Sequence, residues 1–111
     1  MRAVVEQHLP HTGATITFSD RYPAMPPTDG NMQLHAMLSS ISEELGGDPL
    51  PSLDPSRRGA ADISFVAPYA DALGGLGAQG ENMHSPEERL DLDSLPTAIK
   101  RAAVLIYRLT R

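Results

Sequence analysis

A histidine followed by two carboxylates is the segment of this 111-residue sequence whose residue types best suit chemistry. The run is His84-Ser85-Pro86-Glu87-Glu88, and it comes directly after a glycine-rich stretch. An imidazole held by a turn is a common zinc ligand, and a carboxylate that accepts its second N–H can fix the ring for that role. The same pattern fits a solvated loop histidine beside a helix N-terminus, where proline and glutamate are favoured. A single imidazole cannot hold zinc, because the ion takes three or four protein ligands.

A second candidate combines two bases, small residues and an acid. The run Arg57-Arg58-Gly59-Ala60-Ala61-Asp62 fits an anion-binding turn backed by a functional carboxylate. It also fits a salt-bridged loop before a helix that Asp62 caps, and the residues alone favour this second interpretation. The glycines at 74, 75, 77 and 80 leave few side chains, so close approach of another group is expected there. This stretch lacks the Gly-Lys-Ser/Thr of a phosphate-binding loop.

Two helices are predicted to position these candidates. Residues 31–45 carry an apolar face and end at the glycine pair 46–47, and residues 94–109 follow Ser94 as the expected N-cap. The apolar face of the second helix is expected to consist of Ile99, Ala102, Ala103, Ile106 and Leu109.

The N-terminal part of the chain is predicted to contain a helix end and one strand. Residues 1–9 suit the last turns of a helix that Pro10 stops, and the β-branched residues of 14–18 favour a short strand. Prolines and a glycine in 22–30 then predict a linker. The histidines at 8, 11 and 35 are expected on the surface, and the pair Glu43-Glu44 is expected on the solvated face of its helix.

Composition excludes several function classes. A formal charge of −5 argues against nucleic acid or an anionic membrane as partner. The absence of cysteine removes disulfides, thiolate catalysis and thiolate metal sites. No apolar run approaches the roughly 20 residues needed to span a bilayer, and the N-terminus does not have the pattern of a secretory signal. A cytoplasmic protein is therefore expected.

The candidate motifs occur in the order and spacing of a known family. The stretches 59–67 and 76–88 resemble the C-terminal end of the glutamate carboxypeptidase family, which includes acetylornithine deacetylase, succinyl-diaminopimelate desuccinylase and aminoacylase. The family pattern is Gly-Gly-Thr/Ser-Asp-Ala, a Leu-Gly-x-x-Gly loop, then His-Ser with an acid four residues after the histidine, and an apolar helix. In this sequence the Gly-Gly-Thr of the family pattern becomes Gly59-Ala60-Ala61, which lacks the hydroxyl of the threonine.

The resemblance implies roles for individual residues. His84 is similar to the C-terminal zinc ligand, and Glu88 to the carboxylate that supports it. Gly59, Asp62, Gly80 and, more loosely, Arg21 are similar to the residues that contact the substrate. In such enzymes two zinc ions activate a bridging water and polarise the scissile carbonyl. The other zinc ligands and the glutamate general base lie upstream of the part resembled here, so no catalytic residue is expected in this chain.

The resemblance also implies the fold and the partners. An α/β protein is expected, in which 1–22 form the last helix and strand of an α+β lid (dimerisation) domain. Residues 23–30 would be the crossing linker, and 31–111 the C-terminal part of a zinc-exopeptidase catalytic domain. The expected partners are a peptide or N-acyl amino acid substrate, the rest of the catalytic domain and a second copy of the chain.

Two functions are therefore considered. The first is a C-terminal fragment of a zinc-dependent carboxypeptidase-like amidohydrolase, inactive by itself and unable to bind zinc tightly alone. The alternative is a non-catalytic module derived from that family, which binds a partner or dimerises through strand 14–18.

Overall fold

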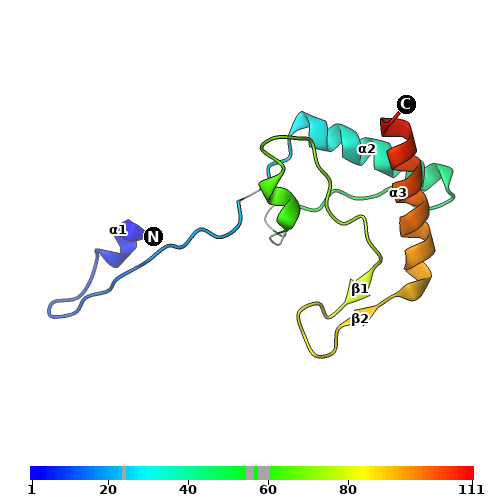
Figure 1. The fold of residues 1–111 in the computed structure, drawn as a ribbon. Coiled ribbons are helices and arrows are strands. Elements are labelled where there is room, and N and C mark those ends of the chain that lie inside the picture. The colour runs from blue at the N-terminus through cyan, green and yellow to red at the C-terminus, as the bar shows by residue number, and fades with distance from the viewer. Residues whose placement is uncertain (24, 55–56, 58–60) are drawn as a thin grey trace.

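The candidate histidine lies in a small hairpin that precedes the last helix of the chain (Figure 1). The structure is a computed structural model that describes residues 1–23, 25–54, 57 and 61–111. Its elements in chain order are α1 (Arg2–Val5), α2 (Asp29–Glu44), η2 (Asp62–Phe65), β1 (Gly80–Glu81), β2 (Arg89–Leu90), η3 (Leu92–Ser94) and α3 (Leu95–Leu109).

Helix α2 confirms the helix predicted over 31–45 and begins two residues earlier. The side chain of Thr28 caps it by accepting a hydrogen bond from the Asn31 N–H at 3.2 Å. The helix ends at the glycine pair, as predicted from the sequence. Gly46 adopts φ +81°, and the N–H groups of Gly46 and Gly47 donate to the carbonyls of Glu43 and Ser42, both at 2.9 Å.

Helix α3 confirms the predicted range but not the predicted cap. The Ser94 hydroxyl makes no capping bond to α3. It donates instead to the Asp91 carbonyl at 2.6 Å and accepts from the Gln79 N–H at 2.8 Å. Helix α3 continues directly from η3, which Asp91 caps through the N–H of Asp93 at 2.9 Å. Ser94 therefore ties the start of α3 to the segment before the hairpin.

The core lies where α2 and α3 pack together. Leu38 and Ile41 of α2 and Leu105 of α3 are buried, and Met37, Leu50, Leu73 and Val104 pack around them. The apolar face expected on α3 is largely on the outside, because Ile99 is 58% exposed and Ile106 is 62% exposed. Apolar residues occupy two sides of α3, and the side that carries Leu105 is the one that meets α2.

The strand predicted over 14–18 does not form, and these residues have no regular secondary structure. A lone strand would leave its backbone ladder groups unpaired, and the described residues provide no neighbouring strand for it. The helix predicted over 1–9 is reduced to α1. Residues 1–23 extend as an arm (Figure 1), and the Cα radius of gyration is 19.6 Å, against about 13 Å for a compact chain of this length. The division into lid, linker and catalytic parts remains a prediction.

Strands β1 and β2 form an antiparallel hairpin, in which Gly80 lies opposite Leu90 and Glu81 opposite Arg89. The Asp91 N–H extends the pairing by donating to the Gln79 carbonyl at 2.9 Å. The hairpin replaces the helix N-terminus that one interpretation placed after His84. Within the described part of the chain, no helix is long and apolar enough to cross a membrane.

Candidate functional site

Loop 82–88, which joins β1 to β2, places His84 in an unusual backbone conformation. His84 has φ +68° and Asn82 has φ +55°, the left-handed region that costs a non-glycine residue about 1–2 kcal/mol. Ser85 braces the loop: its hydroxyl donates to the Asn82 carbonyl at 2.8 Å and accepts from the Glu87 N–H at 3.2 Å. His11 adopts the same conformation with φ +62°, so this backbone geometry alone does not assign a function to His84.

The His84 side chain is exposed and open to a ligand from outside the hairpin. Among the described residues, no hydrogen bond joins His84 to Glu88. Glu88 is also exposed, and its backbone N–H donates to the Ser85 carbonyl at 3.2 Å. The roles of His84 as metal ligand and of Glu88 as its support therefore remain predictions.

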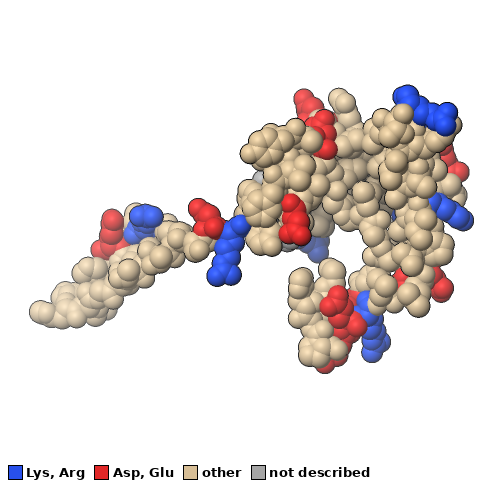
Figure 2. Space-filling model, viewed as in Figure 1, with Lys and Arg blue, Asp and Glu red and all other residues tan. Residues whose placement is uncertain are grey.

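The charge around this loop is negative. Between Gly80 and Ser94 the sequence has five carboxylates and one base, Arg89. Figure 2 shows acidic side chains gathered around the hairpin with a basic side chain beside them. The local field attracts a cation toward His84.

The other predicted site residues are spread over separate elements. Gly80 belongs to the same hairpin, where a Cβ atom would lie 2.8 Å from the Arg89 carbonyl oxygen. The close approach expected in the glycine stretch is therefore made here by backbone of the same hairpin. Asp62 is the exposed first residue of η2, and Arg21 is exposed in the arm. Gly59 lies outside the described residues.

Contacts between elements leave the predicted site in two parts. The rings of Tyr22 and Phe65 lie 5.2 Å apart, so the end of the arm that holds Arg21 contacts the element that Asp62 begins. Figure 1 shows the hairpin well separated from η2, the green turn. The structure thus joins His84, Glu88 and Gly80 in one hairpin but does not join them with Asp62 and Arg21.

The residues that the structure describes do not complete a zinc site. In the described parts of the chain, no group of three or more His, Cys, Asp or Glu side chains is arranged to hold a metal. Zinc takes three or four protein ligands, so His84 can contribute one imidazole to a site whose other ligands come from elsewhere.

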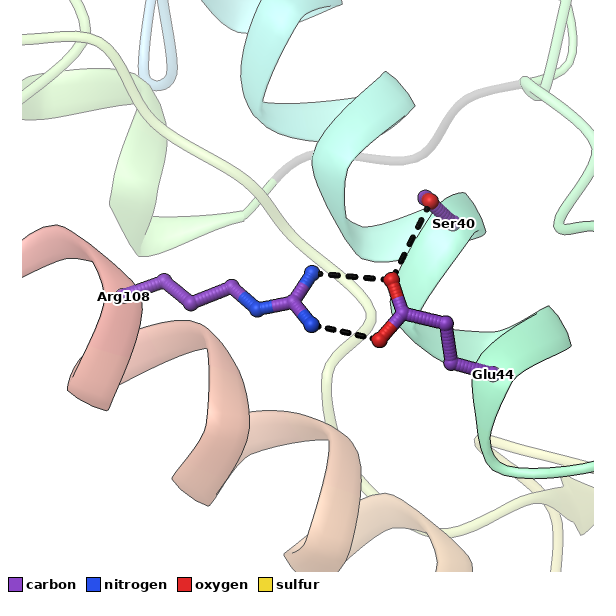
Figure 3. Close-up of polar contacts among 3 residues, drawn as sticks. All are labelled: Ser40, Glu44 and Arg108. Atoms are coloured by element: carbon purple, nitrogen blue, oxygen red, sulfur yellow. Dashed lines mark hydrogen bonds and ion pairs between the residues drawn. The ribbon is translucent and has the colours of Figure 1, made fainter.

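An ion pair between the two long helices was not predicted. Arg108 of α3 donates to both carboxylate oxygens of Glu44 in α2 (Figure 3). The sequence pattern predicted only that Glu44 lies on the solvated face of its helix. The hydrogen bond from Arg108 lowers the pKa of Glu44, and the same bond raises the pKa of Arg108. No sequence signal pairs these residues, because they lie 64 positions apart.

Two buried polar groups were also missed. Ser42 is fully buried, and its hydroxyl donates to the Asp48 carbonyl at 2.6 Å and accepts from Arg101 Nη2 at 2.7 Å. His35, predicted on the surface, is partly buried, and its Nε2 has no hydrogen-bond partner among the described residues. His8 and His11 are exposed as predicted.

Comparison with known proteins identifies the family. The model of peptidase family M20/M25/M40 matches residues 3–108, which is nearly the whole chain. No curated protein and no solved structure gives a significant match.

Proposed function

Because the chain belongs to peptidase family M20/M25/M40, we propose that it supplies the C-terminal part of a zinc-dependent hydrolase, with His84 as a metal ligand. The family gives a metallopeptidase-type origin, and its members are generally zinc-dependent. The finer assignment is to the glutamate carboxypeptidase and aminoacylase type, and it rests on the motif around His84. The proposed substrate is a peptide or an N-acyl amino acid, and the proposed compartment is the cytoplasm.

The position of His84 is the observation that carries this proposal. The residue is exposed at the tip of a hairpin, in a left-handed conformation held by the hydrogen bonds of Ser85. The ring does not fill a space in the described part of the fold, because the residue is exposed. An imidazole presented in this way is available to a metal ion that other residues also bind.

The exposed face of α3 supports the need for a further part of the enzyme. Ile99, Ile106 and Leu109 are each more than half exposed, and Leu92 and Leu95 extend the same apolar character toward the hairpin. Apolar surface gathered along one helix is normally covered by another element. The rest of a catalytic domain would cover it, and would bring the remaining zinc ligands with it.

The chemistry proposed for the whole enzyme is hydrolysis of an amide bond. Bound zinc would supply Lewis-acid activation of water and of the scissile carbonyl. Within this chain, His84 would hold the metal, and Glu88 would orient the imidazole once the loop has a ligand. The residues proposed to contact the substrate are Gly59, Asp62, Gly80 and Arg21. This proposal requires that η2 and the hairpin border one site in the whole enzyme.

A non-catalytic binding module is the second candidate, and the exposed face of α3 is the observation that favours it. Dimerisation through residues 14–18 loses its structural basis, because no strand forms there. A module of this kind would use the α3 face instead.

Calorimetry with zinc and an assay on N-acyl amino acids distinguish the two candidates. The isolated chain should show neither submicromolar zinc affinity nor turnover. Addition of a polypeptide that carries the other family ligands should restore both, and restoration should fail with His84→Asn. Submicromolar binding by the isolated chain, or restored turnover with His84→Asn, would overturn the proposal. A complex that forms through α3 without any zinc binding would favour the module.

A further inference from the structure

The side of α3 that does not face α2 carries an apolar stripe. This α3 stripe consists of Leu95, Ile99, Ala102, Ile106 and Leu109. Its four large members are each at least 39% exposed, whereas Val104 and Leu105 pack toward α2. In Figure 1 the arm lies on the opposite side of the molecule from α3, so it leaves the α3 stripe open.

The spacing of the α3 stripe is that of a coiled-coil seam. Successive members lie four, three, four and three residues apart, which keeps them on one side of the helix over about 21 Å. A seam of this kind is stabilised when a second helix with the same pattern packs against it. The exposed neighbour Ala103 is small, so it does not obstruct the approach of a second helix.

The α3 stripe matches a reversed copy of itself. In an antiparallel pair centred between Lys100 and Arg101, apolar residues of one copy face apolar residues of the other at every level. The facing pairs are Leu92 of η3 with Leu109, Leu95 with Ile106, and Ile99 with Ala102. A two-fold axis relates the copies, so each of these pairs occurs twice.

The charge along this part of the chain also favours an antiparallel pair. Residues 80–94, which lead into α3, have five carboxylates and one base, whereas residues 95–111 have four bases and no acid. Arg111 is exposed and forms no ion pair among the described residues. Reversal of one copy brings its Arg111 to the level of Asp91 and Asp93 of the other copy. A parallel pair would place like charges together at both ends, which is unfavourable.

We infer that the chain, when free from the rest of the enzyme, pairs with a second copy of itself through the α3 stripe in an antiparallel arrangement. The stripe is short, so the contact is small and the pair forms reversibly. This pairing does not depend on zinc binding by His84. In the complete enzyme the remaining domain proposed above would cover the same face of α3, so the two associations exclude each other.

Sedimentation equilibrium of the full chain tests whether the pair forms. The average mass should rise from 11.9 kDa toward twice that value as the protein concentration increases to about 1 mM. Added zinc or a chelator should make no difference, which separates this result from the fate of the function proposed for His84. The mass of one chain at every concentration would overturn the inference and leave the α3 stripe to a different polypeptide.

Two neighbouring substitutions test whether the α3 stripe forms the contact. Ile106→Glu should weaken association by about tenfold or more, because the carboxylate would lose its water against the apolar seam. Tyr107→Glu is the matched control, because it introduces the same charge at a position that is 56% exposed and lies outside the stripe. The control should leave the affinity nearly unchanged. Equal affinities of the two variants would contradict the assignment to this face.

Spin labels test the direction of the pair without altering the α3 stripe. The sequence has no cysteine, so Ala103→Cys and Thr110→Cys each introduce a single labelling site. In an antiparallel pair the two labels at 103 are offset by about 7.5 Å along the axis, and those at 110 by about 28 Å. Dipolar broadening should therefore appear at 103 and not at 110. A parallel pair would broaden both spectra, and any pattern other than the predicted one would overturn the antiparallel arrangement.

Discussion

Arg108 of α3 and Glu44 of α2 face each other across the two helices and share two parallel hydrogen bonds, one of them 3.1 Å long (Figure 3). The Ser40 hydroxyl donates to the same carboxylate at 3.4 Å. Both ionic side chains remain partly exposed, so solvent and salt screen the pair. The pair therefore fixes how the C-terminal ends of α2 and α3 meet more than it adds to total stability.

Glu44→Gln should lower the free energy of unfolding slightly at neutral pH. The hydrogen bond from Arg108 lowers the pKa of Glu44 in the folded state, so the pair stabilises the fold above the unfolded pKa of about 4.3. That contribution is lost as the pH falls through the lowered folded value. Urea unfolding at low salt, at pH 7 and pH 2, should show a difference from the unaltered chain at pH 7 and none at pH 2.

Glu43→Gln is the matched control for this prediction, because it removes a neighbouring exposed carboxylate that forms no ion pair among the described residues. Its effect should be smaller than that of Glu44→Gln and should not depend on Arg108. If the two variants unfold alike at pH 7 and low salt, the pair does not stabilise the fold.

Asn31→Ala should destabilise the chain by about 1–3 kcal/mol, the usual cost of leaving a buried polar group without its partner. Asn31 is buried, its Oδ1 accepts from the Ala72 N–H at 2.7 Å, and its Nδ2 donates to the Pro26 carbonyl at 3.0 Å. Gln33→Ala, at an exposed position two residues further along α2, serves as the control. Equal urea midpoints for the two variants would show that Asn31 does not fasten this part of the fold.

Gly80→Ala should open the β1–β2 hairpin. The added Cβ would lie 2.8 Å from the Arg89 carbonyl oxygen, which is backbone and cannot move aside without separating the strands. Gly77→Ala adds the same methyl group in open space. Amide hydrogen exchange at Asp91, whose N–H bonds to the Gln79 carbonyl, should accelerate in the Gly80 variant and not in the Gly77 variant. Unchanged protection in both would contradict the hairpin as described.

Local patterns in the sequence predicted the two long helices well. Leu38 and Ile41 lie on the predicted face of α2, and Gly46 ends the helix in the left-handed conformation that glycine favours. The buried face of α3 could not be predicted in the same way. Ile106 and Leu105 are neighbours and both apolar, and only the position of α2 decides that Leu105 is covered.

Features that depend on contacts between distant residues were not predicted. Strand 14–18 had suitable residues, but a strand needs a partner that local sequence does not specify. The strands of the hairpin have two residues each, too few for any alternation to show. His84 was found because its neighbours in sequence are informative, whereas the contact of Arg101 with Ser42 joins residues 59 positions apart.

The most direct test of the central claim is the activity and zinc content of the complete enzyme carrying His84→Asn. Asparagine tolerates the left-handed backbone at this position, so the hairpin should keep its shape while the imidazole is lost. His11→Asn is the matched control, because His11 is also exposed and has φ +62°. At saturating zinc, kcat for an N-acyl amino acid should fall by orders of magnitude in the His84 variant, with less zinc retained, and should be unchanged in the His11 variant. Full turnover and full zinc content in the His84 variant would show that His84 is not a metal ligand.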